Sequence, residues 1–329
     1  MTMAIGNIPQ IPYIPLAGGL RTEWGTLSSP GGAMVAYVHH AGTSRVTDIT
    51  AATTVPNVCK TLNEALRQCR SGFGDTVLVL PGHVENISAA DQMSGLVAGT
   101  KIIGLGNGTN RPTFTWTAAT STFLFDAANT ILENCILNMD PGAGTVNVAA
   151  PITVSAAGCQ LRFCLARVST DANSKTTIPI TTTAAGDDFA VVGCEFYGAT
   201  AGEVTTVIRA VGADRLKILG TIIVAATSAV GIGVVQFLTT ASTNVLIDGG
   251  CVFRNNKAAS TAAVTGLTGT TGFCNNTSLL VLANNANQLT MGHADGAWSA
   301  NVDGMMFGMS VGVVNLAGEV AAKAAVVSA

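Results

Sequence analysis

A repeat of about 28 residues runs through the middle of the chain and limits its possible folds more than any other feature. The repeat is marked by a row of small residues, spaced 29, 30, 27 and 30 positions apart: Cys135, Cys164, Cys194, Thr221 and Cys251. An aliphatic row lies three positions earlier: Leu132, Leu161, Val191 and Ile218. Ile247 extends this row if the pair Gly249–Gly250 contains one extra, bulged residue. A second apolar row lies two positions after the row of small residues: Leu137, Ala166, Phe196, Ile223 and Phe253.

A period of this length, built from short strands with no helix in each unit, is typical of a parallel β-solenoid. Equivalent residues of successive coils then lie one above another at the strand spacing of about 4.8 Å. We expect the cysteine row to be a buried core ladder, because cysteine is small, apolar and among the most buried residue types. About eight coils fit between Thr76 and Thr290, and Leu78 and Ile103 begin the earliest of them.

The composition agrees with a stiff β protein that associates with other chains. Only 11% of the residues are charged, against roughly 25% in an average soluble protein. The chain is 48% hydrophobic, which excludes intrinsic disorder. A net charge of −3 with no Lys/Arg cluster argues against nucleic-acid binding. Few charges with much apolar surface suggest that another chain covers part of the exterior.

One stretch imitates a membrane span. Ile218 to Ile247 contains thirty residues without a charge. Half of them are Val, Ile or Thr, which fit pleated strands better than helices. We therefore expect one full coil of the repeat here and no membrane association. Met1 to Pro15 has no basic region and is broken by prolines, so we do not expect a signal peptide.

The sequence divides into four segments: an extended N-terminal anchoring arm (1–50), a capping helix region (51–75), the solenoid (76–290) and a closing or interface segment (291–329). The arm alternates apolar residues and prolines, which favours an extended conformation: Ile8, Pro9, Ile11, Pro12, Tyr13, Ile14 and Pro15. A floppy terminus is the alternative. Thr61 and Glu64 form a capping box, followed by an apolar helical stripe: Leu62, Ala65, Leu66 and Cys69. The helix would cover the open first coil. In the closing segment, Met305, Met306 and Met309 indicate an adaptable interface or a simple terminal cap.

Several segments resemble the start of pectin-lyase-like right-handed β-helices: Leu62-Asn-Glu-Ala-Leu66, Gly74-Asp-Thr-Val77, Pro81-Gly-His-Val-Glu85 and Ile102-Ile-Gly-Leu-Gly106. The resemblance covers about residues 55 to 285 and implies an all-β fold, a right-handed parallel β-helix with a short N-terminal capping helix. It implies no particular chemistry, because fold and function separate freely. The Ala/Thr/Gly-rich coils and proline-rich arm also look like bacteriophage virion proteins of the tailspike-like type. That resemblance implies a homotrimer that serves as a receptor-binding spike or as a capsid decoration.

A solenoid glycosidase would need two carboxylates that converge on one groove, roughly 5–9.5 Å apart. Relative to the cysteine row, Glu133 lies at −2, Glu195 at +1 and Asp214 at −7. We expect none of them to have an acidic partner at the same offset one coil away. Asp187 and Asp188 are adjacent at a turn and are expected in a solvated loop rather than in a catalytic dyad.

The remaining candidate ligands are scattered. The eight cysteines include no CxxC pair, so we favour buried thiols over disulfides or a metal site. His39 and His40 are neighbours on an expected strand and point to opposite faces, and His83 is expected in a turn. Trp24, Trp116 and Trp298 are too far apart in the sequence to predict a sugar-stacking platform. We expect no catalytic residue, no cofactor and no metal.

These observations favour a homotrimeric structural protein of a phage particle, assembled in the host cytoplasm and located in the virion. A decoration protein, attached to the major capsid protein or another virion protein through the arm, is preferred. A tailspike depolymerase that cleaves host surface glycan is one alternative, and a non-catalytic glycan-binding spike is another. Acid pairs along a groove would favour the enzyme, and stacked aromatic residues would favour the glycan binder.

Overall fold

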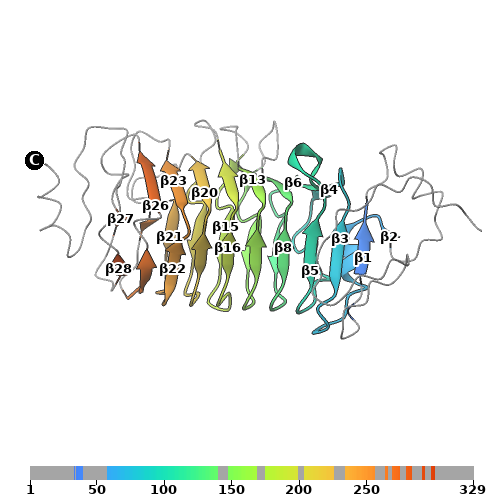
Figure 1. Ribbon diagram of the computed structural model, residues 1–329, viewed down its shortest axis with the longest axis horizontal. Coiled ribbons are helices and arrows are strands. Elements are labelled where there is room, and N and C mark those ends of the chain that lie inside the picture. Colours follow the sequence, from blue (N-terminus) through green and yellow to red (C-terminus); the bar gives the residue numbers. More distant parts are fainter. Residues whose placement is uncertain are drawn as a thin grey trace, which may run out of the picture.

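The computed structural model describes residues 33, 35–39, 58–139, 147–168, 175–198, 204–225, 234–255, 264–265, 269–274, 279–283, 291–292 and 298–300. These residues are nearly all in parallel strands, and the strands stack in coils along one long axis (Figure 1). The result is a parallel β-solenoid, as the repeat predicts, and it is consistent with the pectin-lyase-like fold. The anchoring-arm residues Ile8 to Pro15, and Met305, Met306 and Met309, lie outside the described residues.

Three sheets form the sides of the solenoid. Sheet A contains, in stacking order, β2 (Val58–Cys59), β1 (Val35–Val38), β3 (Thr76–Val79), β5 (Lys101–Gly104), β8 (Ile131–Glu133), β12 (Gln160–Arg162), β16 (Ala190–Val192), β19 (Lys217–Leu219), β22 (Val245–Asp248), β25 (Gly272–Cys274) and β28 (Trp298–Ala300). Sheet B contains β4 (Val84–Ile87), β6 (Thr113–Trp116), β9 (Ile136–Met139), β13 (Leu165–Val168), β17 (Glu195–Tyr197), β20 (Ile222–Ala225), β23 (Cys251–Asn255) and β26 (Leu279–Ala283). Sheet C contains β7 (Phe123–Phe125), β11 (Ile152–Val154), β15 (Ile180–Thr182), β18 (Ile208–Ala210), β21 (Val235–Phe237), β24 (Val264–Thr265) and β27 (Met291–Gly292). A separate pair joins β10 (Asn147–Val148) to β14 (Lys175–Thr176).

The repeat rows face the interior. Strand pairing in sheet A places Leu132, Leu161, Val191, Ile218 and Ile247 at the same level of successive coils. Pairing in sheet B does the same for Leu137, Ala166, Phe196, Ile223 and Phe253. Every member of both rows is at most 1% exposed. The interior is therefore a stack of apolar residues in register, and its largest fully buried side chains are Trp116 and several phenylalanines.

The row of cysteines and threonine lies at the corner between sheets A and B, and its members are buried free thiols or a hydroxyl. The Cys194 thiol donates to the Leu161 carbonyl at 3.4 Å, and the Thr221 hydroxyl donates to the Val191 carbonyl at 3.3 Å. Both side chains thus satisfy a carbonyl group of the preceding coil, so threonine can take the place of cysteine. Burial also raises the pKa of the Cys194 thiol, which keeps it protonated and able to donate.

The earliest coils are offset by one residue from the expectation. Val77 and Ile102, rather than Leu78 and Ile103, are level with Leu132. Ile102 lies 30 positions before Leu132, whereas Leu132 lies 29 positions before Leu161. The corner between β5 and β6 also contains a 3-10 turn, η1 (Gly108–Asn110). Extrapolating a spacing of 29 backwards therefore misplaces the row by one residue.

Near the other end, the extra residue expected at Gly249–Gly250 is present. Ile247 and Phe253 both stay in their rows although one more residue separates them than in the preceding coil. Both glycines have left-handed backbone angles, with φ of +75° and +82°. A side chain would strain either position, so the bulge needs glycine.

A short helix covers the first coil, as the capping box predicts. Helix α2 (Leu62–Leu66) begins after Thr61, whose side chain accepts from the Glu64 backbone N–H. The buried face of α2 consists of Leu62, Ala65 and Leu66, which are all 0% exposed. The helix is shorter than the expected stripe, since Cys69 lies beyond its end.

The solenoid extends past both expected limits. Val35–Val38, which the sequence places in the arm, forms β1 and pairs with β3 in sheet A. At the other end β27 and β28 continue sheets C and A beyond residue 290. The charge-free stretch Ile218–Ile247 forms strands of a coil, β19 to β22. Within the described residues, no helix has the length and apolar character needed to cross a membrane.

Candidate functional site

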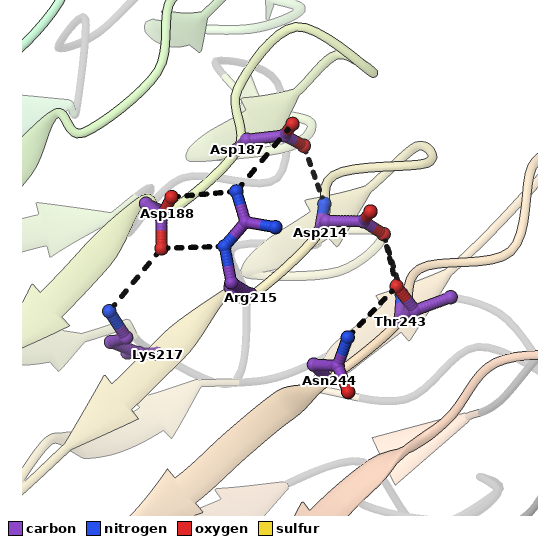
Figure 2. Close-up of polar contacts among 7 residues, drawn as sticks. All are labelled: Asp187, Asp188, Asp214, Arg215, Lys217, Thr243 and Asn244. Carbon is purple, nitrogen blue, oxygen red and sulfur yellow. Dashed lines mark hydrogen bonds and ion pairs between the residues drawn. The ribbon is translucent and has the colours of Figure 1, made fainter.

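The richest group of charged side chains in the described solenoid lies at the corner between sheets C and A. We call it the charged corner: Asp187, Asp188, Asp214, Arg215 and Lys217. These residues come from two successive coils, at the entrances to β16 and β19 (Figure 2). Thr243 and Asn244 occupy the equivalent positions before β22.

The backbone of this corner repeats from coil to coil. Asp188, Arg215 and Asn244 all have left-handed backbone angles, with φ of +56°, +56° and +55°. The Asp188 N–H donates to the Asp214 carbonyl, and the Arg215 N–H donates to the Thr243 carbonyl, both at 2.8 Å. The turn therefore stacks on itself, so side chains at matching positions come into contact.

Asp187 and Asp214 are matched residues, which corrects the expectation that Asp214 has no acidic counterpart. Asp187 precedes Cys194 by seven positions, and Asp214 precedes Thr221 by the same number. The Asp187 carboxylate accepts from the Asp214 backbone N–H at 2.8 Å, and the Asp214 carboxylate accepts from the Thr243 N–H at 3.1 Å (Figure 2). Each carboxylate thus binds the backbone of the following coil instead of facing a groove.

Asp188 belongs to an ion-pair network. Arg215 holds it in a bidentate contact, with Nε and a terminal nitrogen 2.9 and 2.8 Å from its two oxygens. Lys217 Nζ lies 3.5 Å away. Hydrogen bonding from Arg215 lowers the pKa of the Asp188 carboxyl. A carboxylate held in this way is a poor proton donor or acceptor near neutral pH, so the geometry favours a role in joining coils.

A pH dependence follows from the Asp188 contact. Because its pKa is lower in the folded chain, Asp188 stabilises the fold above the ordinary aspartate pKa of about 3.9, and this contribution is lost as the pH falls through the folded value. Asp188→Asn should therefore melt at a lower temperature than the wild type at pH 7, and the difference should close in acid. Thermal scans of both proteins between pH 2 and 7 measure it. A difference that stays constant down to pH 2 would contradict the assignment.

The other acids named from the sequence lie apart. Glu133 pairs with Arg162 of the next coil at 3.4 Å, on the outside of sheet A. Glu195 is exposed on the outside of sheet B. No contact joins either residue to the charged corner among the described residues. The carboxylates of the described solenoid are thus distributed over its sides.

His83 closes the turn at Pro81–Gly82, as expected, with its N–H donating to the Leu80 carbonyl at 3.2 Å. Its side chain is completely buried, and its Nε2 atom lies 3.0 Å from an oxygen of Glu85. Glu85 is level with Phe114 in the inward row of sheet B and accepts from the Leu62 N–H at 2.8 Å. This acid therefore joins the first coil to the N-terminal end of α2. His39 is buried after β1, and His40 lies outside the described residues.

The sequence did not identify Phe163 as a notable residue. It lies at the corner between sheets A and B, has a left-handed φ of +51° and is 47% exposed. Its equivalents one residue before the cysteine row are Asn134, Gly193, Gly220 and Gly250, which tolerate this backbone better. Comparing this position across the coils would have revealed the exception. The ring lies against Gly193, where an added Cβ would be 2.6 Å from Phe163 Cδ1.

Replacing Phe163 should test its strain. A left-handed conformation costs a bulky residue about 1–2 kcal/mol, and asparagine much less. We expect Phe163→Asn to raise the free energy of unfolding by about 0.5–1 kcal/mol, after loss of the ring contact with Arg162. Phe273→Asn is the matched control, because Phe273 is also exposed but lies in the regular strand β25. A lower stability for Phe163→Asn than for this control would contradict the strain argument. Urea denaturation measures both.

The remaining aromatic and ligand candidates do not gather. Trp116 is buried in the core, Trp24 lies outside the described residues, and Trp298 belongs to β28 at the far end of sheet A. Across the described part of the chain, no three His, Cys, Asp or Glu side chains are grouped so that they could hold a metal ion. Comparison of the chain with protein-family models and with curated proteins finds no match.

Proposed function

We propose that this chain is a structural protein of a bacteriophage particle: a trimeric capsid decoration protein that stabilises or ornaments the head. The observation that carries the proposal is the outer surface of sheet B. Leu165, Glu195, Ile222 and Val252 share an outward row there, and the three aliphatic members are half-buried. A rigid rod with several aliphatic side chains along one outer face is suited to packing side by side with copies of itself.

The sequence outside the solenoid supports attachment to a particle. Between Ile5 and Pro15 the chain has four isoleucines and three prolines, a composition unfavourable for a solvated tail. An extended segment of this kind can lie in a groove or add to a sheet edge of another protein. The major capsid protein is the proposed partner, with the solenoid projecting from the head.

Copy number in the particle tests this proposal. Quantitative mass spectrometry of purified native particles should find this chain in numbers comparable with the major capsid protein. A far smaller number would instead favour a tail location. Complete absence from the particles would overturn the proposal of a virion protein.

A spike that binds host glycan is the second candidate, and Phe163 is the observation that favours it. Its exposed ring offers a face on which a sugar could stack, and the Arg111 guanidinium donates to the Phe163 carbonyl at 3.1 Å beside it. On this alternative, Phe163→Asn would abolish binding of labelled host-surface polysaccharide to purified protein. Unchanged binding, or none by the wild type, would remove the support that Phe163 gives to a spike.

A further inference from the structure

Three thiols lie one above another at the corner between sheets A and B, and we call them the thiol ladder: Cys135, Cys164 and Cys194. Strand pairing on both sides of the corner keeps their coils in register. The three corners, residues 133–137, 162–166 and 192–196, belong entirely to the described chain, and all three thiols are buried and free. Packing alone does not require sulfur here, because Thr221 fills the same position in the next coil.

The sulfur atoms of the ladder are spaced by the rise of one coil. Each thiol donates to the backbone carbonyl two residues before it: Cys135 to Glu133 at 3.4 Å, Cys164 to Arg162 at 3.4 Å and Cys194 to Val192 at 3.5 Å. These carbonyls belong to residues that are level with one another in sheet A. Because the side chains repeat the same contact, neighbouring sulfurs are separated by the strand spacing of about 4.8 Å.

This spacing is too long for a disulfide but suits one metal ion between two sulfurs. A disulfide needs sulfurs about 2.05 Å apart and Cβ atoms about 3.5–4.5 Å apart, so two coils would have to be drawn together. The bond between a zinc ion and a cysteine sulfur is about 2.3 Å long, and other first-row metals form bonds of similar length. Two such bonds in a straight line span about 4.6 Å, which is close to one coil rise.

The number of ligands selects the ion. Zinc and iron–sulfur clusters take four protein ligands in structural sites. Among the described residues, not even three His, Cys, Asp or Glu side chains are grouped around one point. Monovalent copper is soft, prefers thiolates and can be held by two of them in a line. The ladder therefore has the ligand type, the ligand number and the spacing for Cu(I).

Binding changes the charge of the corner, and Arg111 can offset the change. Two S–H bonds break, two copper–sulfur bonds form and two protons leave to the solvent, so a neutral pair of thiols becomes a complex of charge −1. The Arg111 guanidinium donates to the carbonyl of Phe163, the residue before Cys164, at 3.1 Å. It therefore places a positive charge beside Cys135 and Cys164.

We propose that the thiol ladder binds one Cu(I) ion in linear two-coordinate geometry, between Cys164 and either Cys135 or Cys194. Because Cys164 belongs to both pairs, the three thiols hold one ion. The bound ion joins two successive coils from inside the solenoid. The site does not depend on the proposed virion role.

Copper stoichiometry of the full-length chain tests the site. The protein is incubated with Cu(I) under nitrogen until uptake stops, because buried thiols are reached only as the coils open locally. Excess copper is removed with a chelator, and native mass spectrometry counts the ions retained. Cys164→Ser should retain one ion fewer than the wild type. Cys251→Ser is the matched control and should retain as many as the wild type, because Cys251 is buried in the same row but follows Thr221 instead of a thiol.

The shared role of Cys164 predicts a pattern among further variants. Cys135→Ser and Cys194→Ser should each keep the ion, whereas the double variant should lose it although Cys164 is intact. Thr221→Cys places a thiol between Cys194 and Cys251 and should raise the count by one ion. This gain keeps the test decisive if a serine variant folds poorly. Zinc offered in place of copper should show no difference between the wild type and Cys164→Ser.

Equal copper in the wild type and Cys164→Ser would overturn the site, and so would a loss in Cys251→Ser as large as that in Cys164→Ser. Loss of the ion in both Cys135→Ser and Cys194→Ser would overturn the two-coordinate geometry, since all three thiols would then be needed. Copper uptake is measured on the purified chain. Its failure is therefore distinct from the absence of the chain from native particles, which contradicts the virion proposal alone.

Discussion

Replacing Trp116 with alanine is expected to lower the free energy of unfolding by about 3–5 kcal/mol, because it removes the largest fully buried side chain in the solenoid. Trp116 ends β6 next to Ile87 of the preceding coil. Its indole N–H donates to the Pro151 carbonyl at 2.9 Å, which links sheet B to the start of a strand in sheet C. The alanine variant leaves a cavity in the stack, while the Pro151 carbonyl keeps the Phe123 N–H as its donor at 2.8 Å.

Trp116→Phe separates the two contributions. It keeps most of the ring volume but loses the hydrogen bond, so we expect a loss of about 1–2 kcal/mol. Urea denaturation followed by circular dichroism measures both variants. If Trp116→Ala costs less than Trp116→Phe, or less than 1 kcal/mol, the interior can collapse around the gap and the packing argument is wrong.

Removing the Glu85 carboxylate is expected to lower the free energy of unfolding by about 2–5 kcal/mol, since the buried Leu62 N–H and His83 ring both lose their contact with it. The Leu62 N–H at the start of α2 and the His83 ring both contact the same Glu85 oxygen. Glu85→Ala should therefore destabilise helix α2, which covers the first coil, more than it destabilises the coils. Hydrogen exchange should show faster exchange of the Leu62 amide than in the wild type, with the amides of the central strand β12 unchanged.

Glu64→Ala is the matched control for this prediction. Glu64 also accepts hydrogen bonds near the N-terminus of α2, from the Lys60 and Thr61 N–H groups, but it does so in solvent. Its loss should cost about 1 kcal/mol. If Glu64→Ala and Glu85→Ala lower the free energy of unfolding equally, the burial of the Glu85 carboxylate adds nothing to its contribution.

The rows of the solenoid could be predicted because their spacing is nearly constant where they were recognised. Each corner from Cys135 to Thr221 places one small donor side chain at the same offset from two apolar rows, and this pattern is visible in the sequence. The register fails at Ile103, because the row residue Ile102 lies 30 positions before Leu132, one more than separates Leu132 from Leu161. A period that varies by one residue between coils cannot fix the register of a coil beyond the recognised rows.

The candidate sites were harder to predict, because polar residues occupy positions that the pattern assigns otherwise. Glu85 lies in an inward row and is acceptable there only because α2 supplies a buried N–H. Asp187 and Asp214 share an offset that could have been found by extending the count to every acid.

The stacking of like coils makes the solenoid a molecular ruler. Each coil pairs only with the one before and the one after, and adds about 4.8 Å to the length of the rod. The coil of β16, β17 and β18 repeats the register of β12, β13 and β15. Duplication or loss of one whole coil would thus leave the remaining rows intact, so selection could adjust the distance between the two ends in equal steps without redesigning the interior.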